Sequence, residues 1–472
     1  MKMKHRRILA SWTAVASISL VSYGVMAAVK TSPHPGRLPD PVVELPTLRI
    51  WAAQGESLLG VKFKHPLAAA IIANDIPKLK AGLKAHQGKP LPTLEGGYSL
   101  VQLACELSRS DCLKLLIEHG AQVNQQGGGP WKPTPLIDAT SVKCHECIKL
   151  LLTHGADPNG LSGEQSNHLK MSPLANAAAV NDSTAIKMLI DAGALVNGPP
   201  DTTPPLIMAA IRCNSEAATS LLSHGADPNA AGPKDRITPM TACASGACPS
   251  IMSQLLSHGA DPHGALNHGQ TPLIQAAWWG SPQCVELLLK HDPDLLAMDH
   301  FGHDATMMAC MRGHADVLKL LIKAGADVNR ANSRGWTPLM FAARHGAEAC
   351  VQILIEHDAD LNANADGWTP LKEAAVKCHP AIVAKLGAAG ANIGYRDRSG
   401  YTAMDNAAAS GCLECLKFLI EAASPTQSER DRARKDIERV LSHDHISKAQ
   451  KARLTACLAL LDGHAKSDTE NP

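Results

Sequence analysis

The chain has 472 residues, 45% of them hydrophobic but only 3% aromatic, and a formal net charge of +1. This composition argues against separate globular domains and suits closely stacked helices rich in Ala and Leu. A near-neutral chain lacks the concentrated basic face that nucleic acid requires, so we expect no nucleic-acid partner.

The N-terminus has the pattern of an export segment. Lys2, Lys4, Arg6 and Arg7 precede an uncharged run over residues 8–29, and small residues around Ala28 offer a cleavage site. The run is also long enough to span a bilayer as a helix. Residues 1–28 are therefore predicted to be a signal peptide or a retained N-terminal membrane anchor. Both alternatives place the remainder in the periplasm, either released or anchored in the inner membrane and facing the periplasm, with no other membrane contact.

Two regions connect this segment to the main pattern of the chain. Residues 29–47 are rich in proline and are predicted to form a semi-rigid linker. Residues 48–97 are predicted to be an N-terminal capping region that contains a divergent repeat, which begins at Pro66.

Two short motifs then recur at a regular spacing. Thr-Pro followed by Leu or Met begins at Thr134, Thr238, Thr271, Thr337 and Thr369. Gly-Ala-Asp followed by Pro or Val begins at Gly155, Gly225, Gly259 and Gly325. From Pro205 to Ala403 the first motif and its degenerate copies are 32 to 34 residues apart, which indicates a repeated structural unit.

The residues of one unit predict two helices and a turn. Thr caps the first helix, and Pro takes its first position, where its missing N–H has no consequence. Apolar residues at helical spacing over residues 317–322 predict a second helix, and Gly325 supplies the left-handed residue that ends it. One such pair cannot bury its own apolar face, so neighbouring units must stack.

The period and the Thr-Pro-Leu motif resemble the ankyrin-repeat family over roughly residues 65–423. The resemblance implies an all-α solenoid of about ten stacked helix-turn-helix units, with ankyrin repeats over 98–423. Beyond the resemblance, a charged stretch and an amphipathic stretch predict a C-terminal helical cap over 424–463, followed by a disordered tail over 464–472. Family members typically act as non-catalytic protein-binding scaffolds. We therefore expect a protein partner of unknown identity, no enzymatic activity, no cofactor and no metal.

In this family, contact residues cluster in the turn before Thr-Pro and at the two residues that end the first helix. The matching positions of this chain hold aromatic and cationic residues, which dominate the energetics of interfaces. The predicted partner-binding residues are Trp278, Trp279, Arg312, Trp336, Arg344, Trp368, Lys377 and Tyr401. The alternative is that the aromatic side chains pack between neighbouring turns and stabilise the stack.

The chain has fourteen cysteines, which in an exported protein suggest disulfides. Two Cys-x-x-Cys pairs at predicted helix starts, Cys144 with Cys147 and Cys412 with Cys415, are candidate disulfides. A redox-active role is the weaker alternative, because thioredoxin-type surroundings are absent. The first apolar position of the second helix is predicted to be a small buried hydrophobe, and it is occupied by Cys112, Cys147, Cys284, Cys350 and Cys415.

Histidine recurs at the end of the second helix, where free carbonyl groups accumulate. We expect a structural role there rather than catalysis or metal binding for His119, His154, His224, His258, His291 and His357.

The sequence thus favours a non-catalytic protein-binding scaffold in the bacterial envelope that holds a partner on the concave face of the array. Two alternatives stay open. One is an immunity-type neutraliser of an exported toxin or effector. The other is a thiol-based oxidative-stress protection factor, which rests on the two Cys-x-x-Cys pairs.

Overall fold

The computed structural model describes residues 65–86, 90–94, 97–127, 132–163, 170–233, 236–442 and 446–467. Within these ranges the regular elements are α-helices, and no helix is long and apolar enough to cross a membrane. The predictions for residues 1–28 and 29–47 lie outside the described residues. The chain divides into two compact units, which we call unit 1 (residues 1–267) and unit 2 (residues 268–472).

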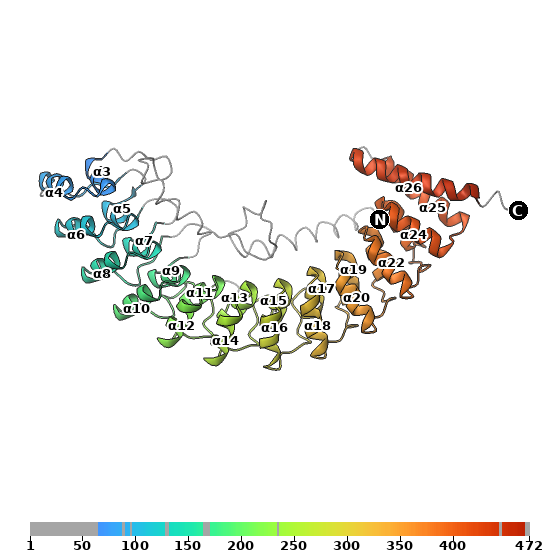
Figure 1. The fold of residues 1–472 in the computed structure, drawn as a ribbon, viewed down its shortest axis with the longest axis horizontal. Helices are drawn as coiled ribbons and strands as arrows, with labels where there is room; N and C mark the ends of the chain where they lie inside the picture. Colours follow the sequence, from blue (N-terminus) through green and yellow to red (C-terminus); the bar gives the residue numbers. More distant parts are fainter. Residues whose placement is uncertain are drawn as a thin grey trace. The chain divides into compact units, whose positions relative to one another are not determined.

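Unit 1 contains six helix pairs among its described residues (Figure 1). The first helices of successive pairs pack side by side in one layer and the second helices in another. The first helices are α3 (Pro66–Ala73), α5 (Leu100–Glu106), α7 (Pro135–Ser141), α9 (Pro173–Ala179), α11 (Pro205–Ile211) and α13 (Pro239–Gly246). The second helices are α4 (Ile76–Ala85), α6 (Ser110–Glu118), α8 (His145–Thr153), α10 (Ser183–Asp191), α12 (Ser215–Ser223) and α14 (Pro249–Ser257).

Unit 2 contains five further pairs and two longer helices (Figure 1). Its first helices are α15 (Pro272–Trp279), α17 (Ala305–Arg312), α19 (Pro338–His345), α21 (Pro370–Val376) and α23 (Ala403–Ser410). Its second helices are α16 (Pro282–Leu289), α18 (Ala315–Lys323), α20 (Glu348–Glu356), α22 (Pro380–Ala388) and α24 (Leu413–Ala423). The last pair is covered by α25 (Gln427–Leu441) and α26 (Lys448–Ser467), which pack on α23 and α24 and on each other.

The expected C-terminal cap corresponds to α25 and α26. Helix α26 continues to Ser467. Residues 464–467, which we had expected in a disordered tail, therefore belong to this helix, because its regular hydrogen bonding extends beyond the amphipathic stretch that the sequence pattern marks.

The first helices begin as the Thr-Pro motif predicts. Each of the five Thr residues is the N-cap, and its hydroxyl accepts a hydrogen bond from the backbone N–H three residues later. In the degenerate unit Asp304 replaces Thr, and its carboxylate accepts from the Met307 N–H at 2.8 Å. A different residue with the same acceptor chemistry therefore preserves the helix start.

The second helices end through left-handed residues and histidine rings. Gly325 has a φ of 93°, and Asp358, which stands where other repeats have Gly, has a φ of 57°. Five of the six histidines place ring Nδ1 2.7 to 2.9 Å from the carbonyl oxygen four residues earlier: His119, His154, His224, His258 and His357. This structural role is confirmed for those five. His291 differs because Lys290 is the C-cap of α16.

The buried core residues recur at the same position in successive repeats. Ten successive second helices carry Leu seven residues after the N-cap, and each is 0% exposed: Leu116, Leu151, Leu189, Leu221, Leu255, Leu288, Leu321, Leu354, Leu386 and Leu419. The five cysteines at the first apolar position of the second helix are likewise 0% exposed, which confirms that this position is buried.

Candidate functional site

All eight predicted partner-binding residues lie in unit 2, on two rows that cross successive first helices. We call the turn row the residues that directly precede the N-cap threonines, namely Trp336, Trp368 and Tyr401. We call the helix-end row the residues at or next to the end of the first helices, namely Trp278, Trp279, Arg312, Arg344 and Lys377. Because these helices pack side by side, each row runs across neighbouring repeats.

The helix-end row begins with a contact between a cation and an aromatic ring. The Arg312 guanidinium carbon lies 4.8 Å from the centroid of the Trp278 ring in the preceding repeat. This is within the range of a cation–π interaction. Trp279 donates its indole N–H to Gln275 Oε1 at 3.2 Å. Both indoles are half-buried and keep part of their surface accessible, and Trp278 links two neighbouring repeats.

Arg344 connects both rows to a buried carboxylate. Its guanidinium lies 5.5 Å from the Trp336 ring centroid and donates to Glu373 Oε2 at 2.8 Å. The Glu373 side chain is only 1% exposed. Burial raises the pKa of Glu373, while the Arg344 charge and hydrogen bond oppose that shift. Arg344 is thus held in place by its own chain, which leaves Arg312 and Lys377 as the exposed cations of the row.

A second ion pair, in which the lysine is buried, supports Trp368. Lys372, 2% exposed, donates from Nζ to Asp397 Oδ2 at 2.7 Å and to the Tyr401 carbonyl oxygen at 3.2 Å. Its Nζ also lies 5.6 Å from the Trp368 ring centroid. Burial alone would raise the pKa of Asp397, but the hydrogen bonds from Lys372 and Tyr401 and the Lys372 charge lower it below its ordinary value.

Sequence reasoning missed Lys372 and Glu373, although a signal was present. The two positions after Thr-Pro-Leu hold Ile274 and Gln275 in α15 and Met340 and Phe341 in α19. Charged residues at two successive positions that are otherwise mainly apolar indicate an internal ion-pair network, because unpaired charges are too costly to bury there.

The turn row divides into packed and accessible aromatic residues. The Trp336 ring is half-buried and its centroid lies 5.2 Å from that of Phe341. The Tyr401 hydroxyl donates to Asp436 Oδ1 of α25 at 3.4 Å. Trp368 is 37% exposed, and two backbone hydrogen bonds to Ala365, at 2.9 and 3.0 Å, fix its turn. Packing between elements therefore accounts for Trp336 and Tyr401, whereas Trp368 remains available.

Positive groups gather around His345, the exposed last residue of α19. Partial burial, followed by the positive charges of Arg344, Lys377, His379 and Arg312, lowers the pKa of His345 to about 4. His345 is therefore neutral at pH 7. Arg312 and Lys377 come from repeats on either side of this histidine and are both exposed, so the helix-end row presents positive charge at the surface.

The cysteines pair differently from the prediction at one of the two Cys-x-x-Cys motifs. Cys144 is bonded to Cys147. The predicted Cys412–Cys415 pair is wrong for this structure, because Cys412 is bonded to Cys378 and the buried Cys415 thiol is free. The prediction from the Cys-x-x-Cys spacing included only cysteines on one helix. Stacking of the repeats brings Cys378 of the preceding repeat next to Cys412.

A third disulfide, Cys213–Cys248, joins adjacent repeats in unit 1 and was not predicted. The available signal was the spacing, since the two inter-repeat pairs are separated by 35 and 34 residues, about one repeat. Among the described residues, Cys378, Cys412 and Cys415 form the one group with metal-ligand chemistry and spacing. Two of these sulfurs are bonded to each other, so we assign no metal to them.

Stacked helix pairs with regularly spaced turns define the class of repeat solenoids that bind other proteins on an extended surface. A family model described as "Ankyrin repeats (3 copies)" matches residues 67–162, 231–299, 306–397 and 361–429, together more than half of the chain. The chain belongs to the ankyrin-repeat family and is a protein-binding scaffold. Among solved structures, the human ASB11 ankyrin repeat domain is 27% identical with a TM-score of 0.44, and the match covers 47% of this chain and 99% of that one.

Proposed function

We propose that this chain is a non-catalytic scaffold of the bacterial envelope that binds an acidic segment of a protein partner along the two rows of unit 2. The observation that carries the proposal is the combination of an accessible indole at Trp368, whose turn is held by two backbone hydrogen bonds, with the exposed cations Arg312 and Lys377 of the helix-end row. Aromatic anchors next to cations are typical of binding hot spots.

Trp368 has the properties of an anchor. Its turn is fixed by the backbone hydrogen bonds to Ala365, and Lys372 supports the ring from beneath the surface. A side chain that is already ordered loses little conformational entropy when a partner covers it, so more of the binding free energy is retained. Tryptophan also combines a large apolar area with an N–H donor, which suits a mixed partner surface.

The exposed cations select the partner by charge. Arg312 and Lys377 are exposed, while His345 between them carries no charge at pH 7. Carboxylates on a partner segment would be attracted to both of these cations. Rim charges of this kind act mainly on the association rate and weaken with added salt.

The envelope location has separate support. Four basic residues before an uncharged run at residues 8–29 are typical of export segments. The three disulfides, Cys144–Cys147, Cys213–Cys248 and Cys378–Cys412, are typical of proteins in oxidising compartments. Fractionation of native cells, with N-terminal sequencing of the mature chain, tests this part. We expect the chain in the periplasm or inner membrane, and recovery in the cytosol would contradict it.

The binding surface is tested by charge reversal with photo-crosslinking in the native envelope. A photoreactive residue replaces Ser333, an exposed residue in the turn before Trp336, and crosslinked proteins are identified by mass spectrometry. The double variant Arg312→Glu, Lys377→Glu should lose at least about tenfold of the main crosslink, as expected for interface charges. The matched variant Lys149→Glu, Lys319→Glu reverses two exposed charges on second helices and should retain it. Equal crosslinking by both variants would reject this surface.

A further inference from the structure

Two disulfides of the chain repeat the same geometry. In each, a cysteine with positive φ that follows a first helix is bonded to the N-cap of the second helix in the next repeat. Cys213, with φ of 55°, is bonded to Cys248 of α14, and Cys378, with φ of 60°, is bonded to Cys412 of α24. We call each of these bonds an inter-repeat clip.

A third disulfide shows another partner that an N-cap cysteine can take in this fold. Cys144 is the N-cap of α8 and is bonded to Cys147 three residues later on the same helix, with a Cα–Cα distance of 5.2 Å. Ser108 holds the positive-φ position of the preceding repeat, so Cys144 has no clip partner there. We call this bond an intra-helix disulfide.

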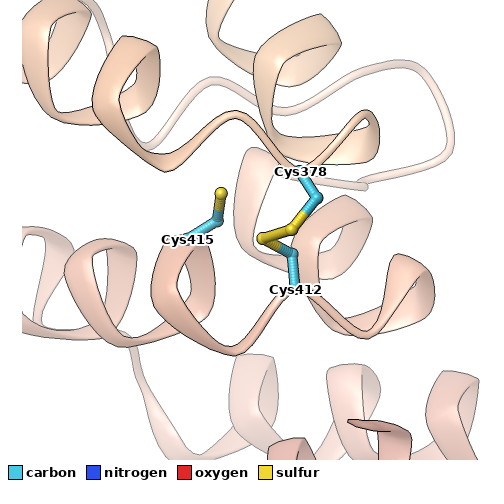
Figure 2. Close-up of side chains that lie close together, drawn as sticks. All are labelled: Cys378, Cys412 and Cys415. Carbon is cyan, nitrogen blue, oxygen red and sulfur yellow. A yellow bond between two sulfur atoms is a disulfide. The ribbon is translucent and has the colours of Figure 1, made fainter. Parts of the chain in front are cut away.

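Cys412 has both kinds of partner. Cys378 occupies the clip position, and Cys415 stands in the position that Cys147 has relative to Cys144. The three sulfur atoms all lie within 4.8 Å of one another, and Figure 2 shows the Cys415 sulfur beside the Cys378–Cys412 bond. In the unit 1 clip the corresponding position is Ile251, so Cys248 has a single partner.

We propose that Cys378, Cys412 and Cys415 form a disulfide-exchange site in which Cys412 moves between an inter-repeat clip and an intra-helix disulfide, releasing Cys378 as a surface thiol. This site goes beyond the proposed binding function. The thiolate of Cys415 attacks Cys412 Sγ, and the Cys412–Cys415 bond forms as the Cys378–Cys412 bond breaks. The electron pair leaves with Cys378 Sγ, which takes from solvent the proton that Cys415 gave up. No oxidant or reductant is consumed.

The exchange moves the free thiol from a buried residue to an exposed one. Cys412 is 1% exposed and Cys415 is 0% exposed, whereas Cys378 is exposed. Reagents and partner disulfides therefore reach Cys378 alone. Lys377 precedes it in the sequence, and nearby positive charge favours the thiolate that forms there.

The rate of the exchange depends on the attacking thiol. Burial, together with the neighbouring Glu414 charge, raises the pKa of Cys415 to about 12. Only a small fraction of this thiol is ionised near neutral pH, so the exchange away from the Cys378–Cys412 bond is slow. Since the thiolate is the nucleophile, the rate should rise about tenfold per pH unit below that pKa.

Alkylation trapping tests the exchange on the full chain, prepared under oxidising conditions. The protein is incubated with iodoacetamide at pH 7.5 and 8.5 and then digested without reduction for mass spectrometry. We expect carboxamidomethylated Cys378 to appear together with a Cys412–Cys415 linked peptide, about tenfold faster at the higher pH. Cys213 of the matched clip should be labelled at least about tenfold less. Equal labelling of Cys378 and Cys213, or no Cys378–Cys412 peptide at the start, would overturn the proposal.

Two variants assign the role of the third cysteine. Cys415→Val introduces the residue that Val317 supplies at the same position, and it should reduce Cys378 labelling to the level of Cys213. Labelling that persists in this variant contradicts the exchange. Ile251→Cys adds a third cysteine to the unit 1 clip and should increase the labelling of Cys213 at least about tenfold. This gain keeps the proposal testable if Cys415→Val loses its helical circular dichroism, and no gain would reject it.

Discussion

Units 1 and 2 share one scaffold but connect their repeats with different side chains. In unit 1 the first helices are joined by amides and hydroxyls. For example, Asn176 Nδ2 donates to Thr140 Oγ1 at 2.9 Å and to Ser141 Oγ at 2.8 Å. In unit 2, indole rings, guanidinium groups and buried ion pairs take this role, and all four tryptophans among the described residues lie there. The comparison shows that the apolar core specifies the stack, while the residues between first helices are free to vary with function.

The two units also differ in the charge of these residues. In unit 1, Gln102 Nε2 donates to Asp138 Oδ2 at 3.0 Å, and Glu106 lies in the same neighbourhood. Burial, followed by the Glu106 charge, raises the pKa of Asp138 well above its ordinary value. Unit 2 instead has the positive helix-end row. Glu106 and Arg344 both lie seven residues after an N-cap, so this position carries an acidic group in unit 1 and a basic group in unit 2.

The largest expected loss of stability comes from substitutions in the apolar core that both units share. Leu221→Ala in unit 1 and Leu321→Ala in unit 2 remove the same fully buried side chain, since both residues lie seven positions after an N-cap and are 0% exposed. Each should lower the free energy of unfolding by about 2 to 5 kcal/mol. Urea denaturation followed by circular dichroism measures both. A loss below about 1 kcal/mol in one unit alone would show that the cores are not equivalent.

The next effect is specific to unit 2. Asp397→Asn removes the charge partner of Lys372, whose ammonium group then remains buried, and should lower stability by about 1 to 3 kcal/mol. The lowered pKa of Asp397 means that its carboxylate stabilises the fold above the ordinary carboxyl pKa and that this contribution is lost as the pH falls through the folded-state value.

Controls separate the ion pair from a general charge effect. Glu421→Gln neutralises an exposed carboxylate in α24 and should leave stability within about 0.5 kcal/mol of the parent chain. Adding Lys372→Met to Asp397→Asn removes the unpaired cation and should recover most of the loss. If the double variant is as unstable as Asp397→Asn, the penalty does not come from the buried charge.

In unit 1 we expect a smaller change in stability, with a pH dependence opposite to that of Asp397. Burial raises the pKa of Glu106 from 4.5 to about 7, so the folded chain holds this proton more tightly than the unfolded chain does. Stability should therefore fall as the pH rises from 4.5 to about 7, with the full penalty above that value. Glu106→Gln should raise stability by about 1 to 2 kcal/mol at pH 8 and change it little at pH 4. Equal effects at both pH values, in parallel denaturation curves, would contradict this account.

The features that the sequence predicted are those that a single repeat encodes. The Thr337 N-cap and the Gly325 helix end depend on residues within one unit, so local spacing was sufficient for both. The burial of Lys372 and the Cys378–Cys412 bond depend on contacts with the next repeat, and the helix–turn–helix pattern does not specify which side chains meet there. The difference between packed Trp336 and accessible Trp368 follows instead from contacts within each repeat, because Phe341 of α19 lies against Trp336.

The most direct test of the account compares Trp368→Ala with Leu195→Ala. Both remove exposed apolar side chains, 37% and 49% exposed, one in the proposed site and one in unit 1. With the partner identified by crosslinking and purified, isothermal titration gives the Kd for each variant, and thermal unfolding verifies that each is folded. We predict that Trp368→Ala weakens binding by about thirtyfold, corresponding to about 2 kcal/mol, while Leu195→Ala binds like the parent chain. Unchanged affinity in Trp368→Ala would contradict the account.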